Sequence, residues 1–227
     1  METGLAARAA IYRYVEPGAL DPRRVAFHAV TAVAPQRVLD VGCGTGEFAG
    51  WLAHETSSNV VGLDLSERMV ELTRQRDVDA VVGDVQYLPF HNGAFDCVTA
   101  LWMLFHVPDL NRALVEIARA LRPGGSLVAV TNGVEHLHEL FRLLDVEPGE
   151  PPFSRENGER ALRQYFSRVE RRDINDWLIF PDRESVMAYT GASLRLRHIA
   201  YKMPADLPLP FRARRAVSIF TAETSPA

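Results

Sequence analysis

The chain has 227 residues, of which 47% are hydrophobic and 24% charged, with a formal net charge of −4 at pH 7. This composition indicates a globular protein and excludes a disordered chain and a disulfide scaffold. The negative charge argues against a broad nucleic-acid-binding surface, and the longest apolar candidate, 95–107, is shorter than the ~20 residues that cross a bilayer.

The N-terminal segment favours a cytoplasmic protein. The first ten residues contain Glu2 and Arg8 and have no apolar centre of the kind found in a signal peptide. Cys43 and Cys97 are then expected to be free thiols, as is usual in the cytoplasm. No pattern in the sequence predicts an oligomeric state.

Up to residue 131, short apolar runs alternate with helical segments. That alternation is typical of a parallel sheet with crossover helices. The expected strands are 37–41, 59–64, 78–83, 95–100 and 126–131. The expected helices are 23–33, a segment around 48–52, 66–76, and an amphipathic helix that Asp109 caps and that the Pro123–Gly125 turn stops.

After residue 131 the alternation is looser. The expected helices are 135–144, 157–166 and a segment around 186–190, and the expected strands are 169–174, 177–180 and 217–221. The proline-rich segment 147–154 is interpreted as the start of an insertion and not as a link to a second domain.

A glycine-rich loop follows the first expected strand. Gly42, Gly44 and Gly46 let the backbone turn tightly and approach a ligand, and the helix that follows presents free N–H groups. Asp64 ends the next strand, where an acid accepts hydrogen bonds from both hydroxyls of a ribose. The loop therefore predicts a ligand that contains an unphosphorylated ribose.

The loop departs from the dinucleotide fingerprint G-x-G-x-x-G. Glu47 stands where the last glycine of that fingerprint would be, and Asp40 lies just upstream of the loop. Two carboxylates would repel a pyrophosphate but suit a cationic ligand. S-adenosylmethionine has a ribose, a sulfonium cation and an ammonium group, and therefore fits.

Four segments resemble, in order and spacing, the motifs of class I S-adenosylmethionine-dependent methyltransferases. They are 38–46 (VLDVGCGTG), 83–90 (GDVQYLPF), 95–109 and 121–127 (LRPGGSL). The resemblance covers about residues 37–131. It is strongest to the type 11 subgroup, which includes ubiquinone and menaquinone methyltransferases and natural-product tailoring enzymes.

The resemblance implies an α/β, Rossmann-like three-layer sandwich. Its sheet would have seven mostly parallel strands with an antiparallel last strand, for which 217–221 is the candidate. The chain would form a single methyltransferase domain over 1–227. Its expected parts are an N-terminal helical lid (1–35), a cofactor-binding core (36–131), a helical insertion over the acceptor pocket (132–166) and C-terminal strands (167–227).

The resemblance also implies a cofactor site. Asp40, Gly42, Gly44 and Gly46 would hold the methionine moiety, and Asp64 the ribose. The adenine would lie beside Leu65 and Met69, with Asp84 and the backbone of Val85 at its amino edge. The side of the cofactor that carries the sulfonium would face Ala100, Leu101 and Trp102.

The acceptor is expected to be a small molecule. His106 is the candidate general base, with the alternative that it caps or packs the helix start at Asp109. Tyr12, Tyr14, Phe105, His136 and Phe141 are candidate acceptor contacts. The residues Glu135, His136, His138 and Glu139 are interpreted as a solvated helix face, so no metal is expected.

Two other functions stay open at this point. A nicotinamide-dependent oxidoreductase is disfavoured by the loop spacing and by the absence of a Tyr-x-x-x-Lys pair, since Lys202 is the only lysine. A cofactor-binding protein without catalysis is disfavoured because the glycine loop is intact.

Overall fold

The computed structural model describes residues 13–147, 149–193 and 196–226. These residues cluster into two compact units. The larger unit comprises 22–132, 151–173 and 218–226, and the smaller unit comprises 13–21, 133–150 and 174–217. The glycine loop and the whole predicted cofactor site belong to the larger unit.

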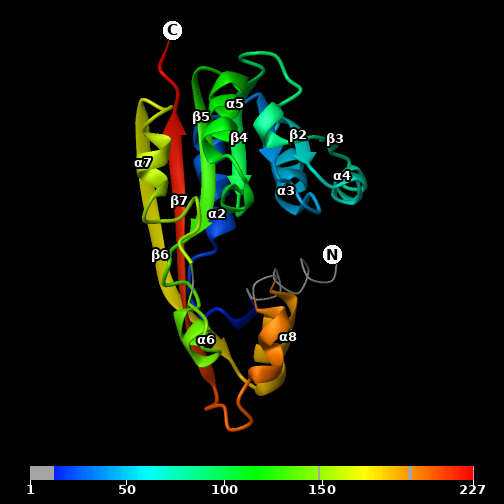
Figure 1. Ribbon diagram of the computed structural model, residues 1–227. Coiled ribbons are helices and arrows are strands. Elements are labelled where there is room, and N and C mark those ends of the chain that lie inside the picture. Colours follow the sequence, from blue (N-terminus) through cyan, green and yellow to red (C-terminus); the bar gives the residue numbers. More distant parts are fainter. Residues whose placement is uncertain (1–12, 148, 194–195, 227) are drawn as a thin grey trace. The chain divides into compact units, whose positions relative to one another are not determined.

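A seven-stranded mixed sheet organises the chain (Figure 1), with strand order β3-β2-β1-β4-β5-β7-β6 and an antiparallel last strand. This order confirms the predicted fold class. Pairing is parallel between β1 and β2, β2 and β3, β1 and β4, and β4 and β5. The strands are β1 (Arg37–Val41), β2 (Asn59–Asp64), β3 (Asp79–Val82), β4 (Phe95–Leu101), β5 (Leu121–Asn132), β6 (Arg168–Phe180) and β7 (Phe211–Glu223).

The strand order reverses between β1 and β4, which fixes where the crossover helices lie. Because parallel crossovers are right-handed, α3 and α4 cover one face of the sheet and α5 the other. The helices are α2 (Pro22–Ala32), α3 (Glu47–Glu55), α4 (Glu67–Arg74), α5 (Leu110–Ala120), α6 (His138–Leu143), α7 (Gly158–Leu162) and α8 (Arg183–Ala192). Short 3-10 turns are η2 (Val85–Tyr87), η3 (Leu104–His106) and η4 (Arg197–Lys202).

The amphipathic helix α5 shows how the sequence pattern becomes packing. Its buried stripe includes Ala113, Leu114 and Ile117, as the spacing predicts, and these side chains join the core against β4 and β5. The Asp109 carboxylate caps the helix by accepting a hydrogen bond from the Arg112 N–H at 2.9 Å. Sequence spacing therefore decides which face of α5 is buried.

The start of β5 differs from the prediction. The Pro123–Gly125 segment was expected as a turn between helix and strand, but α5 ends at Ala120 and β5 already begins at Leu121. Pairing with β4 shifts register between Phe95 and Cys97, and Gly124 has a φ of +69°. A bulge in the strand thus accommodates the residues that read as a turn.

The C-terminal strands are longer than expected. The segments 169–174 and 177–180 form one strand, β6, and β7 begins at Phe211 instead of residue 217. Asp176 accepts two hydrogen bonds from the guanidinium of Arg215, which is 2% exposed. This charge-assisted contact joins β6 to β7 at two residues that lie outside the predicted strand segments.

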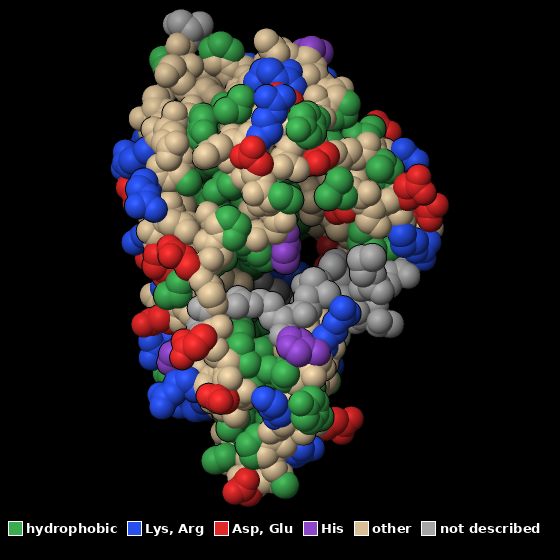
Figure 2. Space-filling model, in the orientation of Figure 1, with side chains coloured by type: hydrophobic (Ala, Val, Ile, Leu, Met, Phe, Trp, Pro, Cys, Tyr) green, Lys and Arg blue, Asp and Glu red, His purple; other side chains and the backbone are tan. Residues whose placement is uncertain are grey.

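The two strands also contribute to the core of the smaller unit. Its buried apolar cluster includes Leu140 and Phe141 from α6, Leu178 and Phe180 from β6, and Val186 from α8. In the part of the chain that the structure describes, no helix is long and apolar enough to cross a membrane. Acidic and basic side chains are intermingled over the face shown in Figure 2.

Candidate functional site

The predicted cofactor residues follow the carboxyl ends of four strands. The glycine loop follows β1, Asp64 ends β2, Asp84 follows β3, and Trp102 follows β4. Because these four strands are parallel, their carboxyl ends meet at one edge of the sheet. The strand order reverses between β1 and β4, which is where open α/β sheets bind ligands.

The glycine loop has a backbone that only glycine adopts without strain. The φ angles of Gly42, Gly44 and Gly46 are +65°, +56° and +74°. A Cβ on Gly42 would lie 2.7 Å from Cβ of Met103, and one on Gly46 would lie 2.8 Å from Cα of Thr73. Conformation therefore favours glycine at all three positions, and close packing requires it at Gly42 and Gly46.

The loop is braced from α4 and from the residues that follow it. The Thr73 hydroxyl donates to the Gly44 carbonyl oxygen at 3.1 Å, and the Arg76 guanidinium donates to the Thr45 carbonyl oxygen at 2.8 Å. The sequence analysis missed both residues. No local signal marks them, because each lies about thirty residues from the atom that it binds.

Asp64 is held beside the loop by backbone donors. Its Oδ2 accepts a hydrogen bond from the Gly44 N–H and its Oδ1 one from the Ser66 N–H, both at 3.0 Å. The preceding residue, Leu63, accepts from the Gly42 N–H at 2.7 Å. These contacts fix the carboxylate in one orientation, and each of its oxygens keeps a second lone pair for a ligand.

Asp40 is the most strongly perturbed acid of the site. It is 3% exposed, and the Thr99 hydroxyl donates to its Oδ1 at 2.6 Å. Burial raises the pKa of Asp40 to about 7, the Thr99 hydrogen bond opposes this rise, and the charge of Asp64 adds to it. A cation placed beside this carboxyl group would favour its ionised form.

Cys43 lies inside the same loop but is not activated. Its Sγ is 3.4 Å from the Thr73 hydroxyl oxygen. Burial and the nearby Asp40 carboxyl group raise the pKa of the Cys43 thiol to about 12. The thiol is thus a packing group of the loop and not a nucleophile.

The residues predicted around the adenine differ in exposure. Leu65 is 71% exposed, whereas the side chains of Met69 and Val85 are buried, as is that of Ala100 on the predicted sulfonium side. Asp84 caps η2, and its carboxylate accepts hydrogen bonds from the backbone N–H and the side-chain amide of Gln86. Among the residues predicted around the adenine, Leu65 and Asp84 therefore have side-chain surface that a ligand can contact.

The end of β4 carries a strained aromatic residue. Trp102 has a φ of +53°, its backbone N–H donates to Val130, and its indole Nε1 donates to Oδ1 of Asn132 at 3.0 Å. A non-glycine residue in this conformation is uncommon and is often found at functional sites. Asn132 is a residue that sequence reasoning did not identify.

Phe105 and His106 follow within η3. Their rings lie 4.4 Å apart, centroid to centroid, and His106 is exposed. The Asp109 side chain caps α5 by accepting a hydrogen bond from the Arg112 N–H. His106 is therefore not needed as the cap of this helix.

Three of the predicted acceptor contacts lie in the smaller unit. Tyr14 packs on Phe180 with ring centroids 5.1 Å apart, and Phe141 is buried in that unit's cluster. His136 accepts a hydrogen bond through Nδ1 from the Ala216 N–H at 3.3 Å. A neutral His136 therefore carries its proton on Nε2 and offers a donor there instead of a base. Tyr12 lies outside the described residues.

The two acidic residues near α6 form ion pairs with Arg214. Glu135 accepts from the Arg214 guanidinium at 2.6 Å, and Glu139 accepts from the Arg214 N–H at 2.7 Å. Within residues 13–147, 149–193 and 196–226, no group of three or more His, Cys, Asp or Glu side chains is arranged to hold a metal ion.

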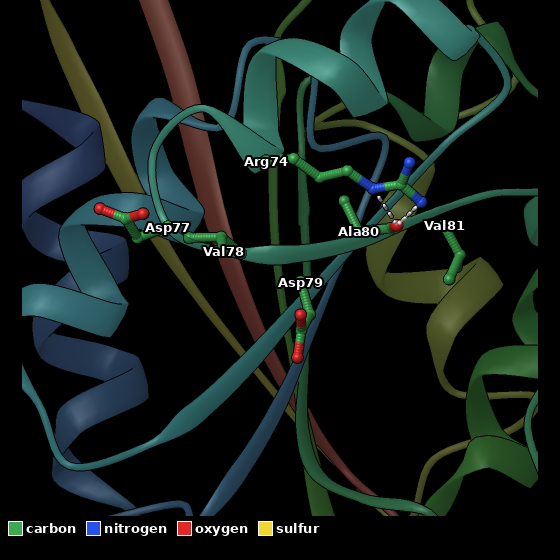
Figure 3. Close-up of a pocket in the computed structure, with 6 residues that line it drawn as sticks. All are labelled: Arg74, Asp77, Val78, Asp79, Ala80 and Val81. Carbon is green, nitrogen blue, oxygen red and sulfur yellow. Dashed lines mark hydrogen bonds between the residues drawn. The ribbon is translucent and has the colours of Figure 1, made fainter.

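A hollow of about 510 Å³ lies beside the edge strand β3 (Figure 3). Arg74 reaches from α4 and donates through two nitrogens to the Ala80 carbonyl oxygen, at 2.6 and 3.0 Å. This guanidinium ties α4 to β3. The hollow contains none of the predicted site residues; its lining is Arg74, Asp77, Val78, Asp79, Ala80 and Val81.

Comparison with known proteins finds relatives that are named as methyltransferases. The family described as "Methyltransferase domain" matches residues 39–129. The methyltransferase GfsG of Streptomyces halstedii is 34% identical over 49% of this chain and 46% of its own length. An O-methyltransferase of Aspergillus nomiae, rstn1, is 31% identical over 65% of this chain and 71% of its own length.

A solved structure shows the same fold. The phosphoethanolamine N-methyltransferase 2 of Haemonchus contortus, in complex with phosphomonomethylethanolamine and S-adenosylhomocysteine, superposes with a TM-score of 0.66 and 20% identity. It covers 99% of this chain and 58% of that one. The family itself is shown by the match to rstn1 over 71% of that relative: the chain belongs to the methyltransferase family. It matches less than half the length of several bacterial relatives.

Proposed function

We propose that this protein binds S-adenosylmethionine at the carboxyl ends of β1 to β4 and transfers its methyl group to a small molecule. One observation carries the proposal. The Asp64 carboxylate is fixed against the Gly44 N–H, beside a loop of three glycines with positive φ, at the point where the strand order reverses. The family assignment supports it, and no relative reported above is named as an oxidoreductase.

The residues present fit this cofactor. The second lone pairs of the Asp64 oxygens would accept the two ribose hydroxyls, and Leu65 offers an exposed apolar surface to the adenine. Asp84 would accept from the adenine amino group. Asp40 would bind the ammonium group, because a neighbouring cation favours the ionised form of its buried carboxyl group.

In this proposal the protein catalyses methyl transfer mainly by aligning the acceptor atom with the methyl group. S-adenosylmethionine would supply a methyl group on a sulfonium sulfur. Trp102, held by Asn132 and by its own backbone, would shape the side of the site where the sulfonium lies, together with Leu101. Keeping an acceptor atom in line with that methyl group removes a large entropic part of the barrier.

For a hydroxyl acceptor, His106 would take up the proton. Its place in η3 is fixed by the hydrogen bond from its backbone N–H to the Met103 carbonyl oxygen at 2.9 Å. The ring is exposed and is supported on one side by Phe105. An amine with a free lone pair would need no such base.

Ligand binding by the purified protein tests the proposal. S-adenosylhomocysteine should raise the melting temperature, and NADH should not. In calorimetry, Asp64→Ala should weaken S-adenosylhomocysteine binding by ~10- to 100-fold, because hydrogen bonds to a charged group are lost. Asp79→Ala, an exposed acid at the start of β3, is the matched control and should bind normally.

Equal dissociation constants for the Asp64→Ala variant and the unmodified protein would contradict the assignment of the ribose to this acid. Stabilisation by NADH and not by S-adenosylhomocysteine would replace the proposal with the oxidoreductase alternative. Binding without turnover of a methyl-labelled cofactor in any host extract would favour a binding protein.

A further inference from the structure

One buried hydroxyl group contacts the glycine loop from below. Thr73 lies in the last turn of α4 and is fully buried, and its hydroxyl donates to the Gly44 carbonyl oxygen at 3.1 Å. A hydroxyl has a single proton, so the Cys43 thiol is the donor in its own 3.4 Å contact with the Thr73 oxygen. The two contacts together fix the direction in which the Thr73 hydroxyl points.

Gly44 is held at both of its peptide groups. Its carbonyl oxygen accepts from Thr73, and its N–H donates to Oδ2 of Asp64 at 3.0 Å. Glycine has the widest choice of backbone conformations, and Gly44 has a φ of +56°. A hydrogen bond on each side of this residue therefore selects one conformation from many, and in that conformation the N–H points at the Asp64 carboxylate.

We propose that Thr73 is a positioning residue for the ribose acid, because through Gly44 it sets the orientation of the Asp64 carboxylate. The inference rests on the proposed function, in which Asp64 binds the two ribose hydroxyls. Thr73 is fully buried and does not reach the ligand itself. Its effect on affinity is therefore indirect, and it should disappear when the Asp64 carboxylate is absent.

A purely structural role of Thr73 is the alternative, since the packing around it is close. A Cβ on Gly46 would lie 2.8 Å from Cα of Thr73, and one on Gly62 would lie 3.1 Å from Cγ2 of Thr73. The methyl group of Thr73 thus fills the space between the loop and β2, whereas its hydroxyl holds Gly44. Substitution can remove the methyl group and the hydroxyl separately.

Calorimetry with S-adenosylhomocysteine distinguishes the two roles. Thr73→Val keeps the shape of the side chain but removes the hydroxyl, and it should weaken binding by ~3- to 10-fold, as expected for one hydrogen bond. Thr73→Ser keeps the hydroxyl but removes a buried methyl group. It should lower the melting temperature, because a cavity is left, and it should leave the dissociation constant unchanged.

Thr190→Val is the matched control. Thr190 is also fully buried, and its hydroxyl donates to the Val186 carbonyl oxygen at 2.7 Å within α8. This variant should lose stability without a change in ligand affinity. Thr73→Ala removes the hydroxyl and adds no bulk, so it should weaken binding as Thr73→Val does and gives the same comparison if the core does not accept valine.

A double-mutant cycle tests the route through Asp64. Thr73→Val should weaken S-adenosylhomocysteine binding in the otherwise unmodified protein, but it should add less than ~2-fold in the Asp64→Ala background. Effects of the two substitutions that multiply in full would show that Thr73 does not act through this carboxylate, and would overturn the inference.

Two further results would contradict the positioning role. Equal binding by Thr73→Val and by the unmodified protein would show that the hydroxyl has no influence on the site, and equal weakening by Thr73→Val and Thr73→Ser would assign the effect to packing. In both cases the unmodified protein still binds the ligand, so the proposed function stands. An unmodified protein that binds no S-adenosylhomocysteine would overturn the proposed function and this inference together.

Discussion

Asp40 in β1 and Asp64 at the end of β2 show how two carboxyl groups beside one loop acquire different surroundings. Asp64 is held by two backbone N–H donors, which fix the orientation of its carboxylate. Asp40 is buried, and burial dominates over the single hydrogen bond from Thr99, so that its pKa rises to about 7. The two acids are thus suited to different parts of one ligand.

The raised pKa of Asp40 makes stability depend on pH. In the folded state the pKa is about 7 and in the unfolded chain 3.8, so folding favours the protonated form. Its contribution is fully present below pH ~4 and is lost as pH rises to ~7, by roughly 4 kcal/mol at most. Urea unfolding of the ligand-free protein at several pH values measures this loss.

Asp40→Asn is the comparison for that prediction. The asparagine keeps an oxygen that can accept from Thr99 but does not titrate, so the difference in stability between the two proteins should change between pH 4 and 7. A constant difference over this range would show that Asp40 is ionised in the folded state throughout.

Measurements of turnover and of melting temperature distinguish a general-base role of His106 from a packing role. With a hydroxyl acceptor, His106→Ala should lower kcat by ~10²- to 10⁴-fold and leave S-adenosylhomocysteine affinity unchanged. His91→Ala, an exposed histidine in the segment before β4, is the control. Normal turnover with a lower melting temperature would instead support a packing role for the His106 ring.

At the scale of elements, α3 joins the glycine loop to the body of the larger unit. Gly46 and Gly50 lie one turn apart, and the Gly50 N–H donates to the Gly46 carbonyl oxygen at 2.8 Å. Gly46 has a φ of +74° and no room for a Cβ, whereas a Cβ on Gly50 would meet Arg76 at 3.5 Å, an ordinary contact. The same substitution should therefore have opposite effects at the two positions.

Gly50→Ala should stabilise the protein by ~0.5–1 kcal/mol, because alanine is the better helix former and loses less backbone entropy. Gly46→Ala should destabilise it by ~1–3 kcal/mol through the left-handed backbone and the clash with Thr73. Chemical denaturation measures both. Equal effects of the two substitutions would contradict the described geometry of the loop.

At the scale of the whole molecule, size and charge bear on the nature of the acceptor. Residues 37–132 supply five of the seven strands and the proposed cofactor site, and the segments before β6 and between β6 and β7 are short. With a net charge of −4, the chain has no overall attraction for nucleic acid. Both features favour a compact acceptor.

Methyl-labelled S-adenosylmethionine, incubated with the protein and a host extract, should therefore place its label in the low-mass fraction. An extract incubated with the Asp64→Ala variant gives the background. Label recovered only in protein or RNA would contradict a small-molecule acceptor and would leave cofactor binding untouched.

The sequence by itself determined the parallel strands up to residue 131 and the glycine loop, and by resemblance the seven-stranded sheet with its antiparallel last strand. These follow from local causes: apolar runs of strand length, glycines at fixed spacing, and the stripe on α5 with its Asp109 cap. Each signal lies within one element, so it can be read without knowing the neighbours.

The tertiary structure decided what depends on distant partners. Thr73 and Arg76 brace a loop about thirty residues away, and Asn132 holds Trp102 across two strand ends. The ion pair of Asp176 with Arg215 joins β6 and β7 at residues outside the predicted strands. Such contacts join residues far apart in the chain, and their energies arise only when folding brings the charges and hydrogen-bonding groups together.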